Sequence, residues 1–254
     1  MLHWRSRGNC EMEIKIMNSE ELSLLFDALA KDIVDAEIYY RLFCDLLEAK
    51  QAYPQTFNQA PTFWFLTLTS LNDAWISRLC RVYDQENSSL SLYNLLDIIK
   101  AHPHLFLKES FRERLQNNPY VDSLAQDARV PQIEQIEKDI QISSPQDPIV
   151  KKLIKWRGNY IAHRGVKPTL NNFQILRDNP LSTEEIKLLL NQSRIIINKY
   201  LFFFRATTWS AQIIGHDDYK SLLKFINLGL KTWGEDIEKQ IAQLGNAFVD
   251  GAGV

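Results

Sequence analysis

The sequence has little of the two residues that interrupt helices. No glycine stands between Gly8 and Gly158, and no proline follows Pro180 in a chain of 254 residues. Because glycine and proline are the residues least compatible with a helix interior, such stretches without them favour long helices. No stretch shows the sustained alternation of apolar and polar residues that is typical of a half-buried strand. The sequence therefore predicts an all-α fold with essentially no sheet.

The chain also has few cysteines, no long apolar run and only a small net charge. Cys10, Cys44 and Cys80 form neither a disulfide framework nor a zinc-ligand set, so we expect reduced thiols in a cytoplasmic protein. The longest apolar runs hold about five residues, as in 200–204, against about 20 for a membrane-spanning helix. A net charge of −2 means that nucleic-acid binding would need a local basic patch. No residues have metal-ligand spacing, and we expect neither a metal nor another cofactor.

Apolar residues recur at helical spacing along most of the chain. Asn18 followed by Glu21 fits a capping box and begins a helix that the pattern carries to about Ala52. Residues 53–60 are predicted as a loop. Further helices are predicted at 61–85, from Ser88 or Ser89 to a point before Pro103, at 105–117, from Pro131 to about Ile140, at 217–233 and at 235–244.

The helix behind Ser182 carries more apolar side chains than one buried face requires. Ser182 and Glu185 fit a second capping box, and the helix is predicted to end near Ile214, before Gly215. A helix that is apolar on more than one face usually buries one face inside its own chain and another against a partner. The apolar positions are Leu188, Leu189, Ile195, Ile196, Tyr200, Phe203 and Phe204.

These patterns divide the chain into three predicted parts. Residues 1–17 are an N-terminal extension expected to lack regular structure. Residues 18–233 form one bundle of long antiparallel helices with short accessory helices. Residues 234–254 form a C-terminal helix with a frayed tail.

One helix between Asp147 and Gly165 carries the residues best suited to chemistry. Asp147 is a favourable N-cap, and Pro148 is a favourable first helical residue because its missing N–H is not needed there. Gly165 can adopt the left-handed conformation that ends a helix. From Pro148 to Pro168 there are four lysines, two arginines and no acidic residue. His163 lies in the last turn, six positions after Arg157.

Helical geometry separates the two residues of this segment that could act on a phosphate. At roughly 100° per residue, Arg157 and His163 point about 120° apart on a straight helix. Asn159 and His163 are four residues apart and share a face. Two antiparallel copies of the helix could bring Arg157 of one chain close to His163 of the other. This geometry gives a second reason to expect a symmetric homodimer with a shared site.

The spacing Arg157-Gly-Asn-Tyr-Ile-Ala-His163 resembles the Arg-x(4–6)-His mark of the HEPN superfamily. The segments Asn72–Asp84 and Ser89–Leu96 and the Asp147-Pro148 start of the motif helix resemble its abortive-infection, AbiU-like branch. The likeness covers roughly residues 20–230. It implies a HEPN-like helical bundle, and in many members a homodimer that cleaves RNA without a metal ion.

The resemblance implies a role for each motif residue. Arg157 would stabilise the phosphate, His163 would act as general acid or base, and Asn159 would orient or bind RNA. We therefore expect a metal-independent endoribonuclease of the abortive-infection or toxin type, with RNA as substrate, no membrane association, and an antitoxin protein as a candidate partner. Further candidates for RNA binding are Lys151, Lys152, Lys155, Arg164 and Lys167.

Gly158 departs from the family pattern, because many active members carry Asn, Asp or His directly after the arginine. The alternative hypothesis is therefore a catalytically inactive HEPN module that binds RNA or a partner protein. A histidine in a last turn can also simply interact with the helix dipole. Lys151, Lys152 and Lys155 favour a solvated face over an RNA track, and Trp156 and Tyr160 favour packing over base stacking. Ion pairs on or near the 61–85 helix are the interpretation favoured for Arg78, Arg81 and Asp84.

Overall fold

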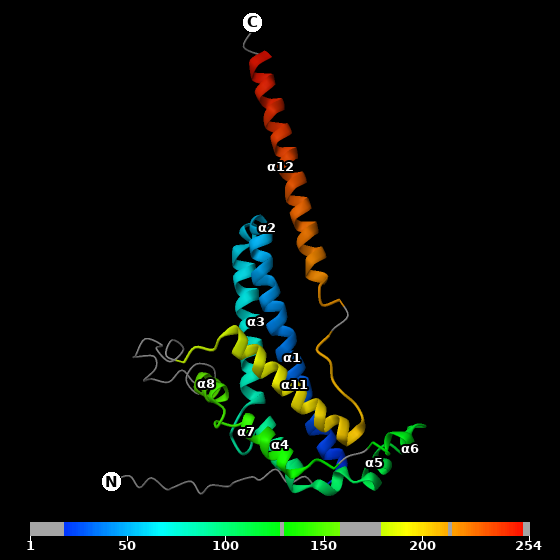
Figure 1. Ribbon diagram of the computed structural model, residues 1–254. Coiled ribbons are helices and arrows are strands. Elements are labelled where there is room, and N and C mark those ends of the chain that lie inside the picture. Colours follow the sequence, from blue (N-terminus) through cyan, green and yellow to red (C-terminus); the bar gives the residue numbers. More distant parts are fainter. Residues whose placement is uncertain (1–17, 128–129, 158–178, 213–214, 251–254) are drawn as a thin grey trace, which may run out of the picture. The chain divides into compact units, whose positions relative to one another are not determined.

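The computed structural model describes residues 18–127, 130–157, 179–212 and 215–250, without the side chains of 244–250 (Figure 1). These residues form helices and turns with no strand, which confirms the all-α prediction. The elements are α1 (Ser19–Ala52), α2 (Pro54–Gln59), α3 (Pro61–Val82), α4 (Leu92–Ala101), the 3₁₀ turn η1 (Pro103–Phe106), α5 (Lys108–Arg114), α6 (Val121–Leu124), α7 (Ile133–Ile142), α8 (Pro148–Trp156), α11 (Thr183–Arg205) and α12 (Asp218–Asp250).

Local capping signals predicted the starts of the long helices correctly. The side chain of Asn18 accepts a hydrogen bond from the Glu21 N–H at 2.9 Å, and the Glu21 carboxylate accepts one from the Asn18 N–H at 3.1 Å. Ser182 and Glu185 form the same reciprocal pair before α11. Each pair satisfies N–H groups that the first helical turn leaves without an internal partner.

Two short segments differ from the prediction. Residues 54–59 form the helix α2 instead of a loop, with Pro54 at its first position. The cap of α4 is Ser91, whose hydroxyl accepts a hydrogen bond from the Asn94 N–H at 3.3 Å. Ser89 lies two residues before this cap, and its hydroxyl donates to the Glu86 carbonyl at 2.8 Å.

The ends of the last two long helices also differ from the prediction. α11 ends at Arg205, and Ala206 takes a left-handed conformation with φ 52°, well before Gly215. The Arg114 guanidinium donates to the Phe204 carbonyl at 2.6 and 3.0 Å, which satisfies one of the carbonyls exposed at this end. Beyond it, one continuous helix, α12, replaces the two helices predicted at 217–233 and 235–244.

The chain divides into two compact units, Met1–Ile38 with Ala74–Ala211 and Tyr39–Asp73 with Gln212–Val254. In the first unit α4 packs against α7, and α11 packs against η1, α5 and α8. The Phe204 ring anchors this core, with ring centroids 5.2 Å from Phe26 and 5.5 Å from Phe106. Burial lowers the pKa of Arg114, which lies over the Phe204 ring, to about 10.

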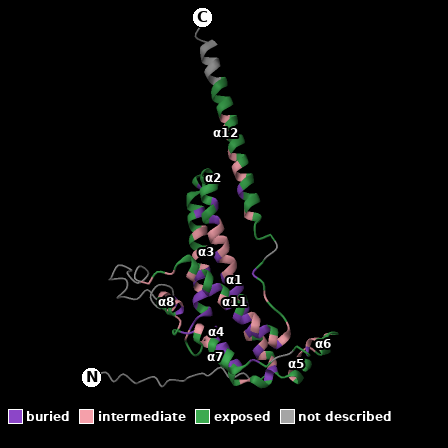
Figure 2. Ribbon diagram, in the orientation of Figure 1, coloured by how far each residue is buried: buried purple, intermediate pink, exposed green. Residues whose placement is uncertain are grey.

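The second unit has its own smaller core, and Figure 2 colours the buried positions of the chain purple. Leu223 of α12 is buried with Phe57 of α2 and Trp64 of α3, and with Leu46 and Ala49 in the second half of α1. The rings of Phe57 and Trp64 stack at 4.3 Å. None of the helices in the described ranges has the length and hydrophobicity to cross a membrane.

Candidate functional site

α8 begins where the sequence predicted and presents Arg157 at its other end. The Asp147 carboxylate accepts hydrogen bonds from the N–H groups of Ile149 and Val150 at 2.7 and 3.1 Å. Val150 is fully buried, and α8 packs against α11. Arg157 follows the last residue of α8 and keeps helical backbone angles. The capped start and the buried face therefore fix the position of Arg157.

Arg157 lies against two carboxylates that come from the loop after α3. Its Nη2 is 2.6 Å from Asp84 Oδ2 and 3.6 Å from Glu86 Oε2. The Asp84 side chain is 7% exposed, whereas that of Arg157 is 32% exposed. The second oxygen of Asp84 accepts a hydrogen bond from the Glu86 N–H at 3.2 Å. The Asp84 carboxylate is thus buried, and each of its two oxygens has a partner. Its charge-assisted contact holds the guanidinium of Arg157 in one orientation.

The loop at 83–91 is itself fixed by hydrogen bonds to other elements. The Tyr83 hydroxyl donates to the Leu189 carbonyl on α11 at 2.8 Å. The Gln85 amide donates to the Ser143 carbonyl after α7 at 3.1 Å. Burial raises the pKa of Tyr83 far above its ordinary value, so this hydroxyl keeps its proton. The two carboxylates that contact Arg157 are therefore held by α11 and by the α7–α8 connection.

The far end of the same loop is anchored by α4. The buried Asn94 amide donates to the carbonyls of Glu86 and Ser89 at 2.8 and 2.7 Å. The Ser91 hydroxyl in turn accepts from the Asn94 backbone. Hydrogen bonds therefore hold the 83–91 loop at both of its ends. Asp84 and Glu86 accordingly have little freedom to move away from Arg157.

Cys80 lies one helical turn before Asp84 and is buried. Burial raises the pKa of its thiol to about 12, with a smaller opposing effect from the nearby positive charge of Arg157. A thiol with so high a pKa holds its proton at neutral pH and is a poor nucleophile. Cys80 is therefore a packing residue beside the site.

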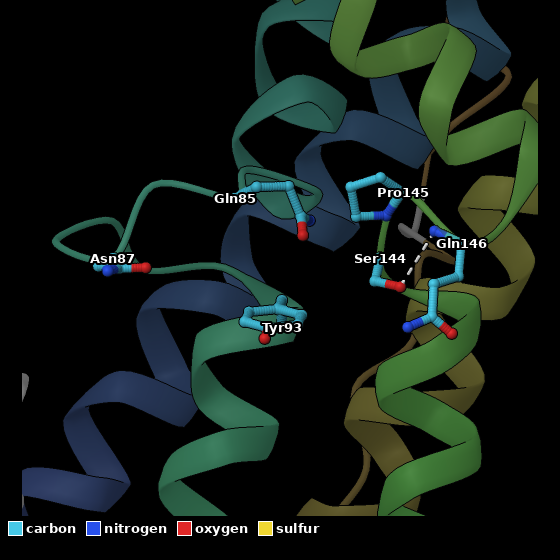
Figure 3. Close-up of a pocket in the computed structure, with 6 residues that line it drawn as sticks. All are labelled: Gln85, Asn87, Tyr93, Ser144, Pro145 and Gln146. Atoms are coloured by element: carbon cyan, nitrogen blue, oxygen red, sulfur yellow. Dashed lines mark hydrogen bonds between the residues drawn. The ribbon is translucent and has the colours of Figure 1, made fainter.

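An open, polar pocket begins next to the acidic residues. Gln85, Asn87 and Tyr93 line one side, and Ser144, Pro145 and Gln146 line the other, around a volume of about 400 Å³ (Figure 3). The loop after α3 and the start of α4 provide one wall, and the connection between α7 and α8 provides the other. Because Gln85 stands between Asp84 and Glu86 in the sequence, the pocket lies next to the two carboxylates that contact Arg157.

The three lysines of α8 differ in their surroundings. Lys152 pairs with Glu185 of α11 at 2.6 Å, and this contact lowers the pKa of Glu185. Lys155 Nζ is 2.7 Å from the side-chain oxygen of Asn179. Lys151 is exposed. Lys151 is thus directed to solvent. Lys152 joins α8 to α11, and Lys155 joins α8 to Asn179, which precedes α11.

The ion pairs expected near α3 are present, but one of them reaches the candidate site. Arg81 pairs with Asp32 at 2.7 Å, and Arg78 pairs with Asp35 at 3.4 Å, both on α1. Asp84 also forms an ion pair next to α3, as expected, and its partner is Arg157, the first residue of the motif. The signal available in the sequence for this pairing was the position of Asp84 at the end of the Asn72–Asp84 segment.

The remaining motif residues lie outside the described part of the chain. These are the predicted catalytic His163, the auxiliary residues Asn159, Arg164 and Lys167, and Gly158. Trp156, the last residue of α8, is half-buried, and its indole N–H donates to the Asn179 carbonyl at 2.8 Å. Among the described residues, no group of three His, Cys, Asp or Glu side chains is placed to hold a metal ion.

Comparison with known families matches residues 19–225 to the HEPN-type family model described as AbiU2. The match includes α1, α3, α4, α8, α11 and the loop that carries Asp84 and Glu86. No curated protein and no solved structure matches the chain.

Proposed function

The chain belongs to the AbiU2 family of HEPN-type proteins, and from this premise we propose that it is a metal-independent endoribonuclease of the abortive-infection or toxin type. The observation that carries the proposal is the fixed guanidinium of Arg157, the first residue of the Arg-x5-His motif. A fixed cation at a phosphate stabilises the charge that develops in the transition state without reorganisation during the reaction.

The proposed reaction is attack by the RNA's own 2′-hydroxyl. A base removes the 2′-proton, the 2′-oxygen bonds to phosphorus, and the bond from phosphorus to the 5′-oxygen breaks as an acid protonates that oxygen. The products are a 2′,3′-cyclic phosphate and a 5′-hydroxyl. A histidine with a pKa near neutrality suits either proton transfer, and we assign this role to His163.

Asp84 is proposed to position Arg157 for this reaction. Within the described residues, the contacts of Arg157 with carboxylates use Nη2 alone. Nε and Nη1 are not part of these contacts, so each can donate one hydrogen bond to a phosphate oxygen. Arginine keeps its charge at all relevant pH values, so the carboxylate serves to orient the guanidinium.

The pocket beside Gln85 is proposed to receive a nucleobase next to the scissile phosphate. Its side-chain amides offer both donors and acceptors, and Tyr93 offers a ring. Unpaired RNA bases are recognised by hydrogen bonds to their edges and by stacking on aromatic side chains. The substrate class that fits this combination is single-stranded RNA.

We also propose a homodimer that uses the outer face of α11. Leu188, Ile195 and Phe202 follow one another at intervals of seven residues and are 42, 52 and 45% exposed. Residues seven apart lie on nearly the same side of a helix, so these three form one exposed apolar ridge. An antitoxin protein is the alternative occupant of this ridge, and the cytoplasm is the compartment we expect.

RNA cleavage in EDTA by purified protein tests the proposed activity. We expect cleavage to 2′,3′-cyclic ends, and a loss of about 100-fold or more for His163→Ala and Arg157→Ala. Arg81→Ala is the matched control, because it removes an arginine from an exposed ion pair outside the site. Cleavage by wild type equal to that of His163→Ala, or no cleavage under any condition, would contradict the proposal.

A second candidate function is a catalytically silent module that binds RNA or a protein. The observation that favours it is the neutralisation of Arg157 by two carboxylates, together with glycine at position 158. Introducing Gly158→Asn separates the two functions. If wild type does not cleave RNA and Gly158→Asn does, the polar group after the arginine was missing. Cleavage by wild type excludes this alternative.

A further inference from the structure

The reaction proposed above moves two protons, and one histidine cannot move both in the same step. The base that removes the 2′-proton must start without a proton, whereas the acid that protonates the 5′-oxygen must start with one. Carboxylates and histidines are the usual groups for both tasks. If the protein is a ribonuclease and His163 supplies one of these groups, a second one has to lie beside the phosphate that Arg157 binds.

Two titratable neighbours of Arg157 are unsuited to this second role. The buried Cys80 thiol keeps its proton at neutral pH, because its pKa is raised to about 12. The Asp84 side chain is only 7% exposed. One of its oxygens lies against Arg157, and the other accepts a hydrogen bond from the Glu86 N–H. Asp84 is therefore placed to hold the guanidinium and is shielded from a substrate hydroxyl.

Glu86 differs from both in its exposure and in its contact with Arg157. Its side chain is 65% exposed, and its Oε2 lies 3.6 Å from Nη2 of Arg157, which is longer than a hydrogen bond. The carboxylate is thus close to the guanidinium and open to a substrate hydroxyl. The Glu86 N–H donates to Asp84 at 3.2 Å, and its carbonyl accepts from the Asn94 amide at 2.8 Å and the Ser89 N–H at 2.9 Å. A base with so fixed a backbone needs little reorganisation to react.

The neighbours of Glu86 in the sequence indicate where it lies relative to the substrate. Gln85 and Asn87 line the pocket proposed for a nucleobase (Figure 3), whereas Glu86 between them contacts Arg157. In a nucleotide the ribose joins the base to the 3′-phosphate and carries the 2′-hydroxyl between them. A nucleotide with its base in the pocket and its 3′-phosphate at Arg157 therefore brings its 2′-hydroxyl towards Glu86.

We propose that Glu86 is the general base of the reaction and that His163 is its general acid. The Glu86 carboxylate takes the 2′-proton while an electron pair of the 2′-oxygen forms the bond to phosphorus. The bond from phosphorus to the 5′-oxygen breaks, its electron pair stays on that oxygen, and the oxygen takes a proton from the His163 imidazolium. Afterwards Glu86 gives its proton to water and His163 takes one from water, so both groups return to their starting states.

An RNA with sulfur in place of the 5′-oxygen at the cut separates the base from the acid. A thiolate leaves without being protonated, so cleavage of this 5′-thio RNA needs a base and no acid. We expect Glu86→Gln to cleave both natural and 5′-thio RNA about 100-fold or more slowly than wild type in single turnovers. His163→Ala should be slow on natural RNA and should approach the wild-type rate on 5′-thio RNA.

Glu137→Gln is the matched control for the loss of a carboxylate. Glu137 is 56% exposed and pairs with Lys100 at 2.9 Å, and its replacement should leave cleavage of both substrates unchanged. RNA with 2′-O-methyl groups has no nucleophile and measures binding alone. Glu86→Gln should bind it at least as tightly as wild type, because a negative charge beside the phosphate is removed. Unimpaired binding would show that the variant is folded and that its defect lies in the chemical step.

Three outcomes would overturn the assignment of the base and leave the ribonuclease activity standing. The first is cleavage of natural RNA by Glu86→Gln at the wild-type rate. The second is recovery of Glu86→Gln on 5′-thio RNA, which would make Glu86 the acid. The third is loss of binding to 2′-O-methyl RNA, which would show a structural role. Absence of cleavage by wild type would instead contradict the proposed activity, and the base with it.

Discussion

Arg157 Nη2 lies 2.6 Å from the buried Asp84 Oδ2, and this contact joins the end of α8 to the loop after α3. Two segments far apart in the sequence thus meet at the first residue of the Arg-x5-His motif. The contact makes Asp84 a positioning residue in the proposed site, and its role can be separated from a purely structural one.

Asp84→Asn removes the charge and keeps the shape of the side chain. We expect the single-turnover rate of RNA cleavage to fall about tenfold, because the guanidinium loses its fixed orientation; tenfold corresponds to about 1.4 kcal/mol in the barrier. Asp35→Asn is the matched control, since Asp35 pairs with Arg78 away from the site. A faster Asp84→Asn enzyme would show instead that Asp84 restrains Arg157 from binding phosphate.

Two inactive variants should complement one another if the site is shared between subunits. A mixed dimer of Arg157→Ala and His163→Ala chains contains one site with both groups intact. Random mixing should therefore recover about a quarter of wild-type cleavage, because half of the dimers are mixed and each has one of two sites. Cleavage that stays at the level of the separate variants after subunit exchange would refute the shared site.

Changes in the pocket should alter which sequences are cut more than how fast the best one is cut. Tyr93→Ala removes the ring and Gln146→Ala removes an amide from the wall, and both leave in place the carboxylates of Asp84 and Glu86 that contact Arg157. We expect the preference between nucleotides beside the cut to change about tenfold, as measured by sequencing cleavage products. Tyr120→Ala, which removes an exposed tyrosine outside this pocket, should leave the preference unchanged.

The buried thiol of Cys80 should make stability depend on pH in the alkaline range. Its pKa is about 12 in the folded protein and 9.0 in its ordinary state, so above pH 9 the unfolded chain binds fewer protons than the folded one. The free energy of unfolding should therefore fall as pH rises from about 9 to 12. Cys80→Ala should show a smaller fall, measured by urea unfolding at pH 8 and pH 10.5. Identical slopes for both proteins would contradict the burial of this thiol.

Removing the cap of α8 should destabilise the fold. Asp147→Ala loses two hydrogen bonds to the first turn, and such losses cost about 1 kcal/mol. Asp147→Ser should recover most of this loss, because a hydroxyl can accept from the same N–H groups. Urea unfolding measures both effects, and an unchanged midpoint for Asp147→Ala would count against the assigned cap.

The sequence by itself determined the helical class, the starts of the long helices and the family. Capping depends on side chains within three or four residues, so Asn18, Asp147 and Ser182 could be recognised without a structure. The ordered motif segments identified the HEPN-type family because each of them is short and continuous in the chain. The helix caps and the motif segments share one physical basis, because residues close together in the sequence are enough to specify each of them.

Only the tertiary structure decided the features that depend on residues far apart in the chain. The pairing of Arg157 with Asp84 and the pocket between residues 85–93 and 144–146 require α8 and the loop after α3 to meet. The early end of α11 at Ala206 coincides with a contact from Arg114 to the Phe204 carbonyl, which no local pattern could show. Burial and long-range hydrogen bonds select among conformations that local propensities leave nearly equal in free energy, and the sequence pattern does not reveal them.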